Sequence, residues 1–187
     1  MTSESIRAIQ AKIGTTVDGI WGRKSIAACQ AHLQRLMDAS PNKWPDTDQA
    51  SLQKFYGSVG DVNQLVALDV SGLGLRYDGT AVTKVRCHHK VAESLHRVLA
   101  SIAATHPGIV AEYAGVFNNR PMRGGTTPSL HARGAAIDLA PDSNGNRTHW
   151  PLAAFMPFEV MEAFAREGWL AAGAFWGRDA MHFQATR

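Results

Sequence analysis

An aspartate, Asp138, interrupts the short apolar run Ala135-Ala-Ile-Asp-Leu139, and this feature limits what the surrounding chain can form. An apolar run of this length, bordered by glycine, predicts a central strand of a sheet. A carboxylate in such a strand is costly to bury unless a cation or hydrogen-bond donors satisfy it. We therefore expect Asp138 to have a cationic partner, and a metal ion would serve.

Two histidines provide further ligand groups for a metal ion. His131 precedes Asp138 in a segment that contains Gly134, and His182 stands near the C-terminal end. A loop–strand passage through Gly134 can bring His131 and Asp138 together, and His182 would come from a separate strand. Two imidazoles and one carboxylate match a catalytic zinc site, which keeps a fourth position open for water. Spacing alone leaves a zinc site and ordinary structural roles for these histidines equally open.

Asp179 lies three residues before His182, so it could not easily bind the same ion without strain. It is better placed as a general base, which takes a proton from the attacking water and passes it to the leaving amine.

The length and composition are those of one domain with a substantial hydrophobic core, or of a small module joined to a larger domain. The chain has 187 residues, of which 45% are hydrophobic and 19% charged, as in soluble globular proteins. A net charge of +3 and a pI of 9.1 would help it approach an anionic polymer. The positive charge alone does not indicate whether that polymer is a cell wall, a membrane surface or nucleic acid. Because no stripe of clustered Lys and Arg is visible, nucleic-acid binding has little support.

Cys29 and Cys87 are isolated from each other in sequence, which excludes a disulfide framework and disfavours a cysteine-based zinc site. Both suit a reducing compartment and a buried, inert role. The N-terminal residues lack the pattern of a secretory signal, and no apolar run approaches the roughly 20 residues that span a bilayer. We expect the protein to be made and kept in the cytoplasm unless something else releases it.

Local patterns predict an α+β fold, with helices packed on a small antiparallel sheet after a short helical N-terminal module. The domain prediction is a helical segment over 1–40, a linker over 41–62 and a main domain over 63–187. The expected helices cover 5–13, 23–38, 47–56, 90–104 and 157–167, and the expected strands cover 64–70, 74–77, 109–117, 135–139 and 180–184.

The pattern Ser129-x-His131-x-x-Gly134-x-Ala136-x-Asp138, followed by Asp179-x-x-His182-Phe183, closely resembles the LAS-type zinc peptidases. These include D-alanyl-D-alanine carboxypeptidases and dipeptidases, and phage L-alanyl-D-glutamate endopeptidases. The resemblance implies that His131, Asp138 and His182 bind one zinc ion and that Asp179 is the catalytic acid/base. Many relatives carry Glu at that last position, and the Asp here looks more like the phage endopeptidase branch.

Arg120 occupies the place where this family carries an arginine before the metal loop. Its guanidinium could hold the scissile carbonyl oxygen or a substrate carboxylate. Arg123 competes for this role, and a solvated loop arginine is the alternative for both. Ser129 is a candidate for orienting the substrate or a ligand, and capping of the loop backbone explains it equally well.

A second resemblance covers the N-terminal segment. The pattern Ile9-Gln10-x-x-Ile13-Gly14-x-x-Val17-Asp18-Gly19-Ile20-Trp21-Gly22-x-Lys24-Ser25 looks like the core of the helical peptidoglycan-binding domain. Trp21 could pack inside the module or present an aromatic face to a sugar, and packing is the favoured role.

Together the resemblances predict a peptidase that cuts peptidoglycan stem peptides with one Zn²⁺. We expect an L-alanyl-D-glutamate endopeptidase that acts as a phage or prophage endolysin, held in the bacterial cytoplasm until it reaches the wall. The alternatives are a D-alanyl-D-alanine carboxypeptidase or dipeptidase with the same site, and a non-catalytic wall-binding protein with structural zinc. The expected partner is bacterial peptidoglycan, bound by a monomer, with no nucleic acid and no stable membrane insertion.

Overall fold

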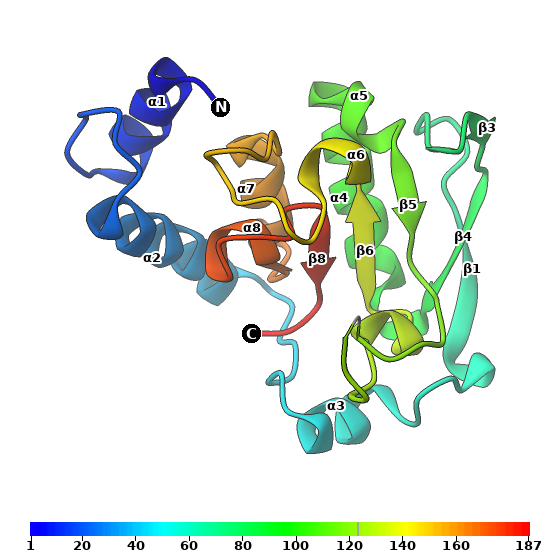
Figure 1. Ribbon diagram of the computed structural model, residues 1–187. Helices are drawn as coiled ribbons and strands as arrows, with labels where there is room; N and C mark the ends of the chain where they lie inside the picture. Colours follow the sequence, from blue (N-terminus) through cyan, green and yellow to red (C-terminus); the bar gives the residue numbers. More distant parts are fainter. Residues whose placement is uncertain (123) are drawn as a thin grey trace.

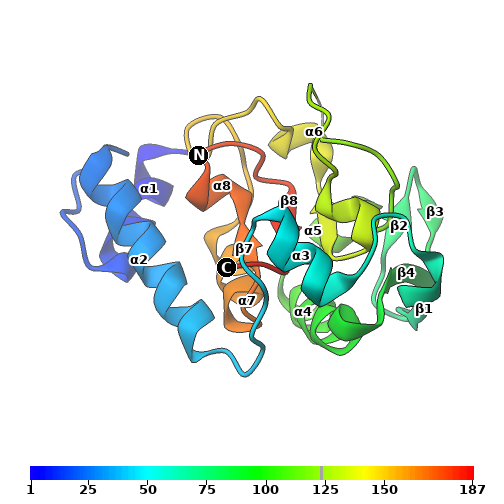
Figure 2. The same ribbon diagram turned by 90° about the horizontal axis from the view of Figure 1, so that it is seen from below.

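The structure is a computed structural model that describes residues 1–122 and 124–187. Its elements in chain order are α1 (Ser3–Ile13), α2 (Arg23–Ala39), α3 (Gln49–Tyr56), η1 (Val62–Gln64), β1 (Leu65–Asp69), β2 (Arg76–Tyr77), β3 (Thr80–Ala81), β4 (Lys84–His88), η2 (His89–Val91), α4 (Ala92–Thr105), α5 (Pro107–Val110), β5 (Tyr113–Gly115), η3 (Leu130–Arg133), β6 (Ala136–Leu139), α6 (Pro141–Asn144), α7 (Phe158–Arg166), β7 (Leu170–Ala171), α8 (Ala172–Phe175) and β8 (His182–Gln184). The N-terminal helices lie on one side of a central sheet and the β1–β4 pair lies on the other (Figures 1 and 2). The predicted α+β class is confirmed.

The central sheet is antiparallel and has the strand order β5-β6-β8-β7, so β6 and β8 are interior strands. Ile137 pairs with Phe183 across β6 and β8, and both side chains are fully buried. Phe183 stacks on Phe164 of α7 with ring centroids 3.9 Å apart. Because side chains alternate between the two faces of a strand, the neighbouring residues Asp138 and His182 project from the opposite face.

The apolar stripes of α4 and α7 bury the core of the domain. On α4 the buried residues include Leu95, Val98, Leu99 and Ile102, the face expected from the sequence. α4 and α7 lie side by side in both views and are in contact (Figures 1 and 2). The indole N–H of Trp169, just after α7, donates to Ser94 Oγ at 2.9 Å and adds a polar link between them.

The first two helices form the expected helix–turn–helix. α1 ends at Gly14, whose φ of 74° lies in the left-handed region that favours glycine. The buried Gln10 organises the turn, because its Nε2 donates to Asp18 Oδ1 at 2.8 Å and its Oε1 accepts the backbone N–H of Gly19 at 2.8 Å. The motif residues Gln10, Asp18 and Gly19 therefore have a structural explanation in this turn.

A buried carboxylate attaches the N-terminal helices to α7. Glu162 of α7 accepts a hydrogen bond from Lys12 Nζ of α1 at 2.5 Å, and its other oxygen lies 2.8 Å from Nε2 of His32 on α2. Two groups that can carry positive charge thus face one carboxylate of the main domain. α2 also packs directly against α7 and α8.

The segment predicted as a linker contains the expected short helix, α3, and is tied to the C-terminal end of the chain. The buried Tyr56 hydroxyl donates to the carbonyl oxygen of Ala185 at 2.6 Å. The division at 40 and 62 stays a prediction.

Three local expectations need correction. No strand was expected over Lys84–His88, but this segment forms β4 and pairs with β1, with Val85 and Cys87 buried. Pro107 begins the short helix α5 instead of only ending α4, because proline fits the first turn of a helix. The strand expected over 109–117 is consequently shortened to β5.

Both cysteines are buried, as expected, and burial raises the pKa of each thiol to about 12. Cys29 and Cys87 therefore stay protonated and unreactive at neutral pH. None of the described helices combines the length and the apolar character that a membrane crossing requires.

The contact at Glu162 yields a stability prediction. We expect Glu162→Ala to lower the free energy of unfolding by about 2–3 kcal/mol, because it leaves Lys12 and His32 without their carboxylate. The loss is less than for a fully buried pair, since the Lys12 side chain is 40% exposed. Urea unfolding followed by tryptophan fluorescence measures it. Glu159→Ala is the matched control, because that carboxylate is 57% exposed and 3.6 Å from Lys12. Equal losses in both variants would contradict the role of Glu162.

His88 is held neutral in the folded protein. Its Nε2–H donates to the Tyr56 carbonyl oxygen at 3.0 Å, and its Nδ1 accepts the backbone N–H of Lys90 at 3.1 Å. Burial lowers the pKa of His88 to about 4, with the neighbouring His89 and Lys90 acting in the same direction.

This pKa predicts a loss of stability in acid. An unfolded histidine titrates near about 6.5, so the unfolded chain binds the extra proton first as the pH falls from that value toward 4. The His88 contribution is therefore complete above about pH 6.5 and decreases below it. We expect wild type to lose more stability than His88→Gln between about pH 7 and about pH 5 in urea unfolding. Identical losses in the two proteins would contradict this pKa.

Candidate metal centre

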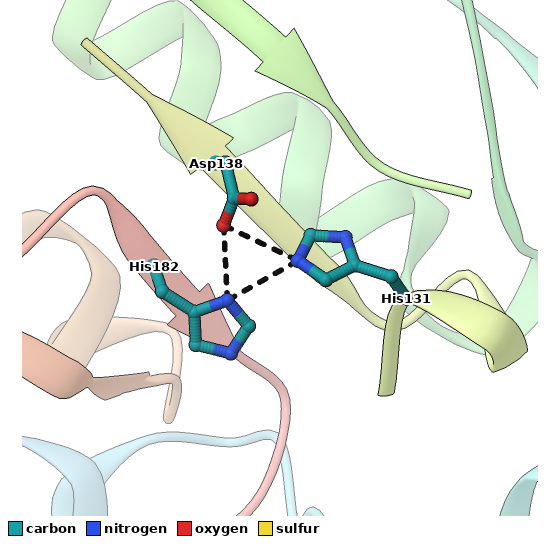
Figure 3. A group of neighbouring side chains, drawn as sticks. All are labelled: His131, Asp138 and His182. Atoms are coloured by element: carbon teal, nitrogen blue, oxygen red, sulfur yellow. Dashed lines mark hydrogen bonds and ion pairs between the residues drawn. The ribbon is translucent and has the colours of Figure 1, made fainter. Parts of the chain in front are cut away.

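The pairing of β6 with β8 creates the first half of the site. Asp138 and His182 are direct partners in the antiparallel register, so their side chains project from the same face. Asp138 Oδ1 lies 2.9 Å from His182 Nδ1 (Figure 3). The register of the two strands is therefore sufficient to bring Asp138 and His182 into contact.

The loop before β6 supplies the second imidazole. His131 lies on η3, and its Nε2 is 3.2 Å from both Asp138 Oδ1 and His182 Nδ1 (Figure 3). η3 ends at Gly134, whose φ is 68°. A Cβ at this glycine would come within 2.8 Å of the backbone nitrogen of His88. Gly134 is therefore required both by its backbone angle and by the close approach of β4.

Hydrogen bonds fix which nitrogen of each ring faces the site. His131 Nδ1–H donates to the Val116 carbonyl oxygen at 2.7 Å, so Nε2 of the neutral ring carries a lone pair. His182 Nε2–H donates to Gln184 Oε1 at 3.1 Å, and the Gln184 amide donates in turn to Thr186 Oγ1 at 2.6 Å. This contact leaves Nδ1 facing the site, where it can bind a metal ion once the ring has lost its second proton.

Three acceptor atoms thus point at one another in a largely buried space. The ligand atoms of His131, Asp138 and His182 all lie within 4.8 Å of one another. Ligands about 2.0–2.1 Å from a tetrahedral zinc ion stand roughly 3.3 Å apart, close to the 2.9–3.2 Å observed here. The donor set fits zinc: two imidazoles with their outer N–H groups held by carbonyl oxygens, and one carboxylate.

The electrostatics of the three groups favour a bound cation. Burial by itself raises the pKa of Asp138, but the hydrogen bonds and charges of His131 and His182 outweigh it and hold this pKa far below its ordinary value. Burial likewise lowers the pKa of His182, and the contact with Asp138 reverses the effect and raises it. Asp138 is therefore ionised at neutral pH and can neutralise positive charge in the site.

Asp179 stands in the turn that precedes β8, with a φ of 60°. Its carbonyl oxygen accepts the backbone N–H of His182 at 2.9 Å, and its negative charge contributes to the raised pKa of that histidine. It does not belong to the cluster of three donors. The structure thus places Asp179 beside the candidate centre, and its role as the catalytic base stays a prediction.

Ser129 and the two arginines were predicted to contact substrate. The Ser129 hydroxyl accepts the backbone N–H of His131 at 3.3 Å and caps η3, which was the alternative explanation. Arg120 donates from Nη1 to the Pro121 carbonyl oxygen at 3.2 Å, a contact within its own loop. Arg123 lies outside the described residues. Substrate binding by all three stays a prediction.

The sequence did not reveal the residues that orient the ligands. Gln184 follows His182 by two positions on the same strand face, and this period could have indicated it. The Val116 carbonyl gives no side-chain signal at all. Trp176 stacks on the His182 ring, with centroids 5.5 Å apart and planes at 24°, and only the folded chain shows this contact.

A family model described as D-alanyl-D-alanine carboxypeptidase matches residues 123–185, the span that contains every residue of the donor cluster and Asp179. Searches of curated proteins and of solved structures found no match. The family match and the donor cluster support a hydrolase of the zinc metallopeptidase class, although the match covers a minority of the chain.

Gln184 yields a prediction about metal affinity. We expect Gln184→Ala to weaken zinc binding by about 10- to 100-fold, because His182 loses the acceptor that fixes its tautomer and ring orientation. Gln184→Glu is the matched control, since it keeps a side-chain oxygen in the same place. Competition with a chromophoric zinc chelator measures both affinities. Equal weakening in the two variants would contradict an orienting role of the Gln184 oxygen.

Proposed function

We propose that this protein is a zinc-dependent peptidase that hydrolyses the peptide stems of bacterial peptidoglycan. The observation that carries the proposal is the convergence of three lone-pair donors, from His131, Asp138 and His182, inside the span that matches the peptidase family. Among the described residues this cluster has only three donors, which leaves room for water or substrate. A structural zinc site would use four protein ligands, so catalysis is favoured over a purely wall-binding role.

Different residues of the chain would bind the metal ion, transfer protons and hold the substrate. When bound, zinc would polarise the scissile carbonyl and lower the pKa of the attacking water. His131, Asp138 and His182 hold the ion, and the strand pairing together with the Val116 and Gln184 hydrogen bonds keeps their atoms aligned.

Proton transfer and substrate holding belong to other side chains. Asp179 takes the proton of the attacking water and delivers it to the departing amine nitrogen. Arg120, in the loop before η3, holds the carbonyl oxygen or a carboxylate of the substrate, for which its guanidinium has to leave the contact with Pro121.

The bond between L-alanine and D-glutamate is the proposed cleavage site, because position 179 holds Asp as in the endopeptidase branch that the sequence resembles. An enzyme of this kind would act as an endolysin once it leaves the cytoplasm. The second candidate is the bond between two D-alanines, which the description of the matching family favours. Purified muropeptides incubated with the zinc-loaded protein and analysed by mass spectrometry decide between them. Peptides that begin with D-glutamate support the first bond, free D-alanine supports the second, and intact muropeptides overturn the peptidase function.

Asp179 provides the sharpest test of the mechanism. We expect Asp179→Asn to retain zinc but to lower kcat/KM by about 10²–10⁴-fold, because the water loses its proton acceptor. His182→Ala should lose both zinc and activity. Asp142→Asn, at an exposed position, is the matched control and should hydrolyse muropeptides at the wild-type rate. Full activity in Asp179→Asn would remove this residue from the mechanism.

A further inference from the structure

A groove of about 310 Å³ lies where α2 and α8 are in contact. Its walls come from distant parts of the chain: Trp21 and Ile26 from the N-terminal helices and their turn, His149 and Leu152 from the loop after α6, and Trp176 from the end of α8. Ligand pockets usually measure about 300–1,000 Å³, so this groove suits a single ring with its substituents.

Trp176 is shared between the wall of the groove and the surroundings of the metal centre. The indole of this residue lines the groove and also stacks on the ligand His182. On the other wall Trp21 packs edge-on against Trp150, with centroids 5.2 Å apart, so the N-terminal module completes the groove. A molecule with one group in the groove could therefore place a neighbouring bond at the metal centre.

The uncharged side chains that line the groove favour a neutral ligand with an apolar face. Among the described residues that line the groove, none is Asp, Glu, Lys or Arg. Apolar side chains are open to solvent there, since Leu152 is 62% exposed and Ile26 39% exposed. Both the carboxylates of a stem peptide and a cationic ligand would be poorly matched to such a surface.

His149, at the rim of the groove, provides a hydrogen-bond acceptor that could orient a ligand. His149 Nδ1–H donates to the Gly177 carbonyl oxygen at 3.1 Å, so Nε2 of the neutral ring is an acceptor. An exposed acceptor beside tryptophan side chains that line the groove suits a ligand that combines an apolar ring face with hydroxyl and amide N–H donors. An N-acetylated amino sugar has this chemistry.

We propose that the groove is a sugar subsite, which binds the N-acetylated amino sugar that carries the stem peptide. This inference rests on the proposed function. In peptidoglycan this sugar is attached directly to the L-alanine of the stem, so it stands one residue from the bond proposed for cleavage. The sugar in the groove and the L-alanyl-D-glutamate bond at the metal centre then belong to one bound molecule. Trp21 gives the N-terminal module a part in substrate choice.

The first experiment compares two substrates of the zinc-loaded full chain. One is a disaccharide–peptide, and the other is the same peptide freed of its sugars. We expect a kcat/KM for the glycosylated substrate that is higher by on the order of tenfold, the effect of a few aromatic and apolar contacts. Equal values for the two substrates would overturn the subsite. Loss of hydrolysis with both would overturn the proposed function instead, and binding then decides the subsite.

Groove variants test which surface recognises the sugar. We expect Ile26→Ser and Leu152→Ser to reduce the ratio of the two kcat/KM values toward one. Ile20→Ser is the matched control, because Ile20 is 68% exposed but does not line the groove. Trp21→Ala should act like the groove variants if it folds, and the two exposed positions keep the test valid if it does not. A ratio unchanged in both Ile26→Ser and Leu152→Ser would overturn the proposal.

A binding measurement works without any catalysis. We expect a disaccharide of N-acetylglucosamine, titrated into the zinc-free protein, to shift the indole N–H resonances of Trp21 and Trp176 in NMR spectra. The same titration of Leu152→Ser should show at least a several-fold weaker affinity, and that of Ile20→Ser should match wild type. Absence of shifts in the wild-type protein, together with equal hydrolysis of both substrates, would assign the groove to another ligand.

Discussion

The candidate site depends on the register between β6 and β8. Ile137 and Phe183 pair on the face that packs against α7, and this apolar contact fixes how the two strands align. A slip of one residue would exchange the two faces and bury Asp138 in the core, at a cost that the fold avoids. The packing of the core thereby sets the distance between Asp138 and His182. The metal centre is a consequence of the hydrophobic pairing behind it.

The second constraint is that three acceptor atoms share one small space. Each histidine donates an N–H hydrogen bond to an outer oxygen, the carbonyl of Val116 or the side-chain amide of Gln184, and its other ring nitrogen faces the site. With an ionised Asp138 between them, these groups are satisfied either by a proton on His182 or by a metal cation that all three bind. The hydrogen bonds behind the ligands therefore matter as much as the ligands themselves. They orient both imidazole rings toward the candidate metal site.

The N-terminal helices pack directly against the region that contains the candidate metal centre. Glu162, Lys12 and His32 connect them to α7, and the groove between α2 and α8 forms only because they are in contact. In sequence this segment resembles a separate wall-binding module. Its motif residue Gln10 serves the turn, whereas Trp21 reaches the groove wall next to Trp150. One short segment thus combines a structural turn motif with a wall of the groove.

The sequence by itself determined the strongly periodic helices, the central strand around Asp138 and the residues that would meet in the site, because these depend on local patterns and on residue chemistry. It missed β4 and α8, since a five-residue strand and a four-residue helix carry little local signal. It also could not show that Gln184, the Val116 carbonyl and Trp176 surround the histidines. These contacts join segments far apart in the chain, and only the packing of the sheet against its helices brings such atoms within hydrogen-bonding or stacking distance. The sequence supplied the ligand types, and the tertiary structure decided their orientation and the groove beside them.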